Sequence, residues 1–300
     1  MKYLHKIGNL LCILSIIFIG RYLYLKFNEI DAISLQKCFN LIFLLKIMVI
    51  LVPIFLLCVL IWQFILKSNG QYLSYHNSFI ILSLSNINKY LPGNIFQYAS
   101  RGLFAYKYGV PVAISTISII QETLIVVISG CMIGCTGLLM FGHSPVSPYL
   151  LLIVIFFGLF AVHPRILNIL TMLVVKITGK VHNPFPAENK SRYLFYAFIF
   201  TFLIFIFWGI AFSVLLSALD HDATNILIIS IFAFSLSWVA GFVTPGAPAG
   251  IGVREAALIL LLQNTVSPAV AVTAAGLLRI ITTTAEILFF LVGYLLKSLD

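Results

Sequence analysis

The chain has 300 residues, of which 61% are hydrophobic and only 9% are charged, and its mean hydropathy is +1.10. A soluble domain carries about 25% charged residues, so we exclude a water-soluble fold and any appended soluble catalytic domain. The apolar runs are long and unbroken, which excludes a membrane β-barrel of short alternating strands. We therefore predict an all-α polytopic membrane protein.

The charged residues and cysteines exclude further classes of function. Lys and Arg outnumber Asp and Glu by 18 to 9. In a membrane protein this excess marks cytoplasmic loops and contacts with anionic lipid, so it does not indicate a nucleic-acid partner. Cys131 and Cys135 lie one helical turn apart without the His or acidic neighbours of a metal site. We expect no metal and no other cofactor.

Apolar runs predict six full membrane spans. No cleavage site follows the basic N-terminus, so the first run is interpreted as a span, and Pro53 predicts a kink in the second. After His163-Pro164, apolar residues at helical spacing predict an interfacial amphipathic helix from Arg165 to Lys180. The predicted spans are Ile7 to Leu25, Leu41 to Leu66, Val112 to Phe141, Pro148 to Val162, Arg192 to Leu219 and Val270 to Leu296.

Two further apolar stretches, Ser78 to Tyr108 and Thr224 to Leu262, are interrupted by proline and glycine. Pro92-Gly93 interrupts the first stretch, and a segment of nine residues from Thr244 to Gly252 interrupts the second. Irregular backbone at membrane depth survives only where protein or a water-filled cavity satisfies its polar groups. We predict two re-entrant hairpins, each with two half-helices that meet near mid-membrane at a Pro-Gly break.

The distribution of Lys and Arg predicts the orientation, because cytoplasmic loops are enriched in these residues. We expect a multi-pass protein of a prokaryotic cell membrane, with both termini in the cytoplasm. Lys26 and Lys37 are exceptions. The residues placed inside are Lys2, Lys6, Lys67, Arg165, Lys176, Lys180, Lys190, Arg192 and Lys297, and those placed outside are Glu29, Asp31, His143, Asp220 and Asp222.

The two broken stretches share one pattern of spacing. Arg101 lies nine residues after Pro92, and Arg254 lies nine residues after Pro245. Glu122 and Arg279 each lie eleven residues after a later proline. In the predicted orientation the copies enter from opposite sides, as in the inverted repeats of transporters. We divide the single membrane domain, 1–300, into a first repeat (41–141), a connecting span with the interfacial helix (142–190) and a second repeat (191–297).

The residues around both breaks resemble a known family. Asn88-Lys-Tyr-Leu-Pro-Gly-Asn94, Arg101-Gly102, Gln121-Glu122 and Pro245-Gly-Ala-Pro-Ala-Gly-Ile-Gly-Val-Arg-Glu-Ala-Ala257 are similar to the transmembrane domain of lysylphosphatidylglycerol synthases. The family includes free-standing flippase-like proteins, and the resemblance covers roughly the whole chain. In the synthases this domain is implicated in moving a lipid between leaflets, so the resemblance implies lipid translocation rather than lipid synthesis.

The chain departs from the family pattern at two points. Ala247-Pro248 stands where the family often has a second glycine after Pro-Gly, and Thr123 stands where a basic residue often follows the membrane Glu. We therefore carry over no charge pair at Thr123.

Two arginines near the Pro-Gly breaks are candidate headgroup ligands. Free N–H groups and the helix dipole attract anions at a half-helix N-terminus, and a guanidinium suits a phosphate. The alternative is that each arginine pairs with a structural carboxylate, for Arg254 either Glu255 or Glu286. The predicted headgroup site comprises Arg101, Arg254, Pro92, Gly93, Pro245, Gly246, Gly250 and Gly252.

Acidic residues within two repeat-related spans predict a shared polar cavity, because charged side chains inside a bilayer are costly. A carboxylate there could take up a proton or contact a cationic headgroup. The alternative is a salt bridge between helices, most simply Glu122 with Arg279. The predicted cavity residues are Glu122, Arg279, Glu286, Lys89 and Glu255, and Gly130 with Gly134 predicts close helix packing.

The expected function is a lipid flippase or transporter that moves an anionic phospholipid or a lipid-linked headgroup of the polyprenyl-phosphate type. No phosphate-binding loop motif occurs, so we expect no ATP drive. The expected partners are the membrane lipid and a separate lipid- or glycan-synthesising enzyme. The sequence contains no hydrolase, kinase or zinc-site motif, so we do not expect an enzyme. The alternatives are an intramembrane lipid-modifying enzyme, a membrane subunit of one, and a non-transporting assembly subunit.

Overall fold

The computed structural model describes residues 40–90, 96–141, 148–178, 192–219, 226–244, 250 and 252–299. Within these residues there are ten α-helices, one short 3-10 helix and no strand. The all-α prediction is therefore confirmed for the described part of the chain. The predicted first span, Ile7 to Leu25, lies outside it.

Among the described residues, five helices are long and apolar enough to cross a membrane. A helix rises 1.5 Å per residue, so about 20 residues cross the hydrocarbon core of roughly 30 Å. Four of the five have 28 residues or more and match predicted spans. The five are α3 (Leu41–Ser68), α6 (Val112–Phe141), α9 (Arg192–Leu219), α10 (Ile226–Val243) and α12 (Pro268–Leu299).

Two helices differ from the predicted set of full membrane spans. The predicted span Pro148 to Val162 forms α7 (Pro148–Val162), whose 15 residues rise only about 22 Å. The helix α10 was expected as a half-helix, but its 18 residues rise about 27 Å. Its length follows from an apolar run that continues to Val243 before the irregular segment begins.

The first broken stretch forms α4 (Tyr75–Asn86), η2 (Ile87–Tyr90) and α5 (Phe96–Lys107). The side chain of Ser74 caps α4 by accepting a hydrogen bond from the Asn77 N–H at 3.1 Å. The predicted break at Pro92-Gly93 lies outside the described residues.

The second broken stretch continues after α10 into α11 (Val253–Leu262). Gly250 and Gly252 have φ angles of 70° and 86°, which side chains other than glycine rarely adopt. The Glu255 carboxylate accepts a hydrogen bond from the Gly252 N–H at 2.7 Å and so caps the start of α11. The break at Pro245-Gly246 lies outside the described residues.

The predicted amphipathic helix forms α8 (Pro164–Thr178), directly after His163. One face buries Leu167, while Ile169 and Met172 remain exposed. The Asn168 amide oxygen accepts a hydrogen bond from the Gln121 side chain of α6 at 3.1 Å, which anchors α8 to the bundle. Its predicted location at the membrane surface stays a prediction.

Glycines on α6 allow α10 to approach closely. A Cβ at Gly130 would lie 2.6 Å from Val239 of α10, and one at Gly134 would lie 2.2 Å from Leu236. The predicted close packing at these two glycines is therefore confirmed. Because the two helices run antiparallel at this contact, the C-terminal end of α10 lies beside the middle of α6.

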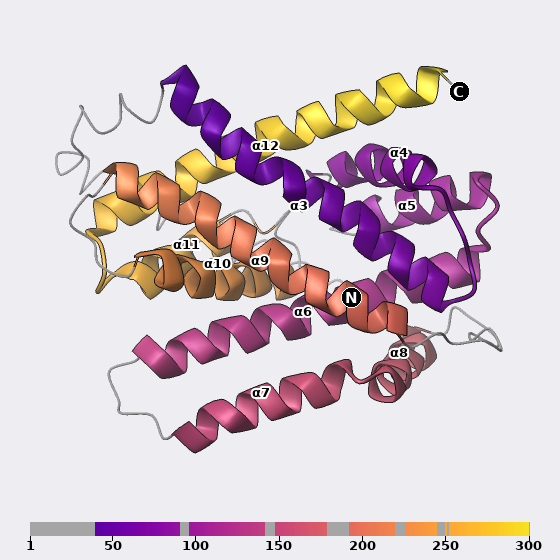
Figure 1. Cartoon of the computed structure of the whole chain (residues 1–300), viewed down its shortest axis with the longest axis horizontal. Coiled ribbons are helices and arrows are strands. Elements are labelled where there is room, and N and C mark those ends of the chain that lie inside the picture. The colour runs from indigo at the N-terminus through magenta and orange to yellow at the C-terminus, as the bar shows by residue number, and fades with distance from the viewer. Residues whose placement is uncertain are drawn as a thin grey trace.

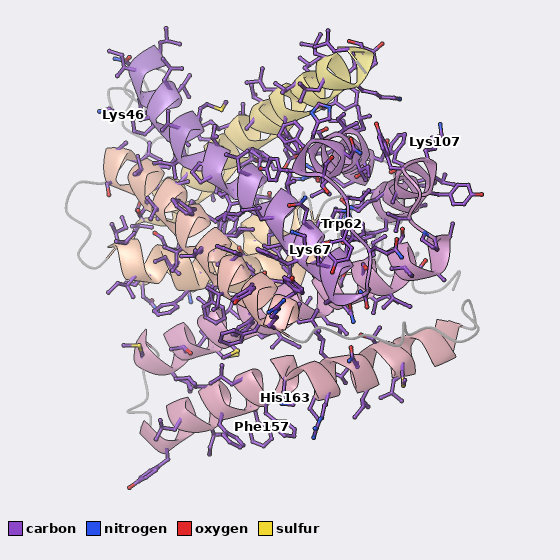
Figure 2. All side chains as sticks on the ribbon, turned by 45° about the vertical axis from the view of Figure 1, so that its right-hand side comes forward. Lys46, Trp62, Lys67, Lys107, Phe157 and His163 are labelled. Carbon is purple, nitrogen blue, oxygen red and sulfur yellow. The ribbon has the colours of Figure 1, made fainter. Side chains whose placement is uncertain are left out.

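Figure 1 shows how the broken segments are arranged in the bundle. The helices α4 and α5 lie at the right of the view, and α10 and α11 lie at the left. The helices α3 and α9 pack against each other and cross the view diagonally, while α12 packs against α4. Figure 2 shows Trp62 of α3 within the bundle and Phe157 of α7 on its outer face.

Candidate functional site

A cavity of about 230 Å³ lies between the two broken segments and the long helices. Apolar side chains form most of its wall, and charged and polar side chains from both segments reach it. Such a mixture is typical of sites that bind small molecules. The polar lining residues are Asn86, Lys89, Gln97, Tyr98, Arg101, Glu122, Thr123, Thr201, Arg254 and Glu286.

Arg101 of α5 forms an ion pair with Glu122 of α6. The Arg101 Nη1 atom lies 2.6 Å from Glu122 Oε2, and Arg101 is only 6% exposed. Its guanidinium carbon also lies 5.2 Å from the centre of the Trp62 ring, within the range of a cation–π contact. The Arg101 Nε atom has no hydrogen-bond partner among the described residues. The ion pair therefore leaves the buried Nε–H of Arg101 unsatisfied.

Lys89 of η2 forms a second ion pair, with Glu286 of α12. The Lys89 Nζ atom lies 2.5 Å from Glu286 Oε1. The Tyr90 hydroxyl donates to Glu286 Oε2 at 2.7 Å and lies 3.1 Å from Thr283 Oγ1. Glu286 is 7% exposed, and its two neighbours on η2 compensate the cost of burying its charge. This pair joins the first broken segment to the last helix.

Arg254 of α11 is the third basic residue of the cavity. Within the described part of the chain, no carboxylate lies within salt-bridge distance of its guanidinium. The guanidinium carbon lies 5.3 Å from the centre of the Phe234 ring. Its aliphatic stem passes between two glycines: a Cβ at Gly241 would lie 2.2 Å from Arg254 Cγ, and one at Gly250 would lie 2.9 Å from Cδ.

The charges that line the cavity do not balance. Three basic residues face two acidic ones among the described lining residues, and both acidic residues are already paired. An excess of one charge in a cavity with low-dielectric walls produces a strong local field of that sign. The site is therefore suited to an anion, which Arg254 could hold.

Aromatic side chains from α9 and α10 form another part of the wall. Trp208 and Trp238 both line the cavity. Trp208 stacks on Phe234 with ring centres 5.0 Å apart, and Trp238 stacks on Phe242 at 5.2 Å. Sequence reasoning missed this aromatic wall. The available signal was that both tryptophans lie inside apolar runs, whereas tryptophans of membrane proteins concentrate at the interfaces.

The structure brings together some of the predicted site residues but not all. Arg279 lies outside the cavity wall, with its guanidinium 5.9 Å from the Tyr90 ring. Glu255 and Gly252 are engaged in the cap of α11. Predicted residues that line the cavity are Lys89, Arg101, Glu122, Gly250, Arg254 and Glu286, whereas Pro92, Gly93, Pro245 and Gly246 lie outside the described residues.

The expected salt-bridge partners are corrected. Glu122 pairs with Arg101 and not with Arg279, because α5 packs against α6 and brings Arg101 to that face. Glu286 pairs with Lys89 and not with Arg254, because η2 lies beside α12. The two salt bridges predicted from the sequence, Glu122 with Arg279 and Glu286 with Arg254, were therefore wrong about the basic partner. Both carboxylates nevertheless form salt bridges.

Comparison with known protein families identifies the chain. Residues 10–293 match the family model of the lysylphosphatidylglycerol synthase TM region. The match covers most of the chain, so the chain belongs to this family. The resemblance that the sequence motifs indicated is therefore confirmed. The comparison with curated proteins gives no match.

Proposed function

We propose that this member of the lysylphosphatidylglycerol synthase TM region family moves an anionic phospholipid or lipid-linked headgroup between leaflets without ATP. The observation that carries the proposal is the cavity itself. Basic side chains from both broken segments converge there on one polar space with mostly apolar walls, and Arg254 has no carboxylate partner in the described residues. A headgroup could occupy this space while its apolar tails stay in lipid.

The proposed path uses both broken segments as re-entrant hairpins of an inverted repeat, in which α10 ends near mid-membrane although its 18 residues are long enough to cross a membrane. In support, Phe242 at the C-terminal end of α10 and Val126 in the middle of α6 line the same cavity. Lys89 and Arg101 come from the first broken segment and Arg254 from the second. Rocking of one repeat against the other would open the headgroup site to each leaflet in turn.

The paired carboxylates favour binding over chemistry. A general acid or base must exchange a proton with the reacting group. Glu122 and Glu286 are instead held by basic partners at 2.6 and 2.5 Å. Their ion pairs join α5 to α6 and η2 to α12, which would fix the two basic residues in the cavity wall.

Reconstitution into liposomes tests the proposal. We expect the protein to speed the exchange of a fluorescent anionic phospholipid between leaflets above the rate of protein-free vesicles, as measured by chemical quenching of the outer leaflet. Arg254→Gln should slow the exchange about tenfold or more, because a hydrogen bond to a charged group contributes about 1.5–3 kcal/mol.

A matched control separates this effect from a general loss of charge. Arg165 lies exposed on α8, away from the cavity. Arg165→Gln should therefore leave the exchange rate unchanged. If no anionic phospholipid or polyprenyl phosphate is exchanged faster than in protein-free vesicles, the proposed function is wrong.

A further inference from the structure

Aromatic side chains gather where the C-terminal end of α3 meets the start of α9, outside the cavity. Phe64 of α3 stacks on Tyr193 of α9 with ring centres 6.1 Å apart, and on Phe200 at 5.6 Å. Tyr196 packs against the same Phe64 ring at 5.7 Å and remains 43% exposed. None of these four side chains lines the cavity, so they belong to a separate surface.

Two basic residues lie beside the stacked rings. The Lys67 Nζ atom lies 5.8 Å from the centre of the Phe64 ring, and the Arg192 guanidinium carbon lies 5.0 Å from the centre of the Tyr193 ring. Because these two rings stack on each other, the two cations flank one aromatic pair. Arg192 is exposed and Lys67 is half-buried, so a ligand outside the bundle can reach both. The α3–α9 patch is defined below as Phe64, Lys67, Arg192, Tyr193, Tyr196 and Phe200.

No carboxylate of the described residues balances these two cations. That part of the chain contains three acidic side chains, and each of them is engaged elsewhere. Glu122 and Glu286 form ion pairs in the cavity wall, and Glu255 caps the start of α11. The α3–α9 patch is therefore positively charged and complementary to an anion.

The position of the patch indicates which anion it meets. Both helices are long enough to span a membrane, and the patch lies where the end of one adjoins the start of the other (Figure 1). Tyrosine rings concentrate at the headgroup level of a bilayer, and basic residues at the ends of membrane helices attract anionic headgroups. A free anion would contact the two cations alone, whereas a lipid also presents apolar surface to the rings.

We propose that the α3–α9 patch binds the headgroup of an anionic phospholipid in the adjoining leaflet, at a site distinct from the cavity. The lipid phosphate would lie between Lys67 and Arg192, and the upper part of its acyl chains would pack against the exposed ring of Tyr196. This site goes beyond the proposed function, because binding at the patch does not require transport.

The patch adjoins the wall of the cavity. Phe64 and Phe200 belong to one hydrophobic cluster with Ile61 and Ile204. Ile61 and Ile204 line the cavity and lie one helical turn from the two phenylalanines along α3 and α9. A lipid at the patch would therefore lie beside the cavity without occupying it.

Photocrosslinking of the full-length protein in vesicles tests the site directly. A benzophenone amino acid replaces Tyr196 and keeps an aromatic ring there, and the vesicles contain equal amounts of phosphatidylglycerol and phosphatidylcholine. After irradiation, mass spectrometry identifies the lipid attached at this position. We expect phosphatidylglycerol to be captured at least about threefold more often than phosphatidylcholine, because both basic residues attract its negative charge.

Charge variants and a second crosslinker position assign the preference to the patch. Lys67→Gln with Arg192→Gln should lead to equal capture of the two lipids, whereas Lys67→Arg with Arg192→Lys keeps both charges and should preserve the preference. Lys46→Gln removes an exposed charge near the other end of α3 and should leave the preference unchanged (Figure 2). A crosslinker at Leu288 of α12, which is 52% exposed and nine residues from the nearest basic residues of its helix, should capture both lipids equally.

Two results would overturn the inference: equal capture of both lipids at position 196 with the basic residues present, or a preference that persists after both are replaced by Gln. The proposed function fails separately, because capture does not depend on transport. Preferential capture without lipid exchange would refute transport alone, and lipid exchange without preferential capture would refute this second site alone.

Discussion

At the scale of single residues, the pair formed by Arg101 and Glu122 shows how a membrane protein keeps charges inside an apolar bundle. The two side chains come from different helices, and each compensates the desolvation of the other. The ring of Trp62 covers the guanidinium and excludes other partners on that side. The ion pair therefore keeps Arg101 in the cavity wall, and the Glu122 carboxylate is engaged in this pair.

This pairing predicts strongly non-additive effects on stability. Arg101→Gln or Glu122→Gln alone leaves a buried charge unpaired and should lower the free energy of unfolding by about 3–5 kcal/mol. The double variant should lose clearly less than the sum of the two single losses. Thermal or denaturant unfolding in detergent measures this double-mutant cycle, with Arg165→Gln as the exposed control. Additive losses would show that the two side chains do not interact.

The charged site residues could be predicted from the sequence, but their partners could not. Charges inside apolar helices are costly, so the sequence alone marks four of them as candidate site residues. These are Arg101, Glu122, Arg254 and Glu286. Which basic residue meets which carboxylate depends on how α5 and η2 pack, and equal spacing in the two broken stretches carries no information about that. The matched position of Arg279 therefore pointed to the wrong partner for Glu122.

At the scale of elements, the long spans follow from apolar length alone, whereas the broken segments do not. Spacing and composition predicted α3, α6, α9 and α12, because about 20 apolar residues suffice to cross a bilayer. The helix α10 ends at Val243, where the Pro-Gly segment was expected to begin, but its 18 residues were interpreted as a half-helix because a re-entrant hairpin reaches only mid-membrane. The aromatic wall of Trp208 and Trp238 was also missed, since it forms only where α9 and α10 pack together.

The close contact of Gly241 with Arg254 predicts that alanine at this position slows lipid exchange, although alanine favours a helix more than glycine does. Gly241→Ala should favour the helical conformation of α10 by up to about 1 kcal/mol. Its new Cβ would nevertheless lie 2.2 Å from Arg254 Cγ, so the arginine must move. We expect slower lipid exchange in liposomes while α10 stays helical by circular dichroism.

Gly276 of α12 provides the matched control for this substitution. A Cβ there would meet no atom within 4 Å. Gly276→Ala should therefore leave lipid exchange at the level of the unmodified protein. Unchanged exchange in Gly241→Ala would show that the position of the Arg254 side chain is not needed for transport.

At the scale of the whole molecule, the basic residues and the long helices together predict which ends face the cytoplasm. Lys67 lies at the C-terminal end of α3, and Lys297 lies in the last turn of α12. Both helices carry a basic residue in the last turn, as expected for cytoplasmic ends. Asn69, directly after α3, hydrogen-bonds Ser118 and Gln121 in the N-terminal part of α6, so the C-terminal end of α6 would then face outward.

Labelling of single cysteines in intact cells tests this orientation. Tyr72 follows α3 and is 61% exposed, and Met140 lies near the C-terminal end of α6 and is 58% exposed. After the native cysteines are replaced, Met140→Cys should react with a membrane-impermeant maleimide from outside. Tyr72→Cys should react only after the membrane is permeabilised. The reverse labelling pattern would show that the orientation is inverted, and that each broken segment enters from the side opposite to the one proposed. Labelling of both cysteines from outside would contradict the interpretation of α6 as a membrane span.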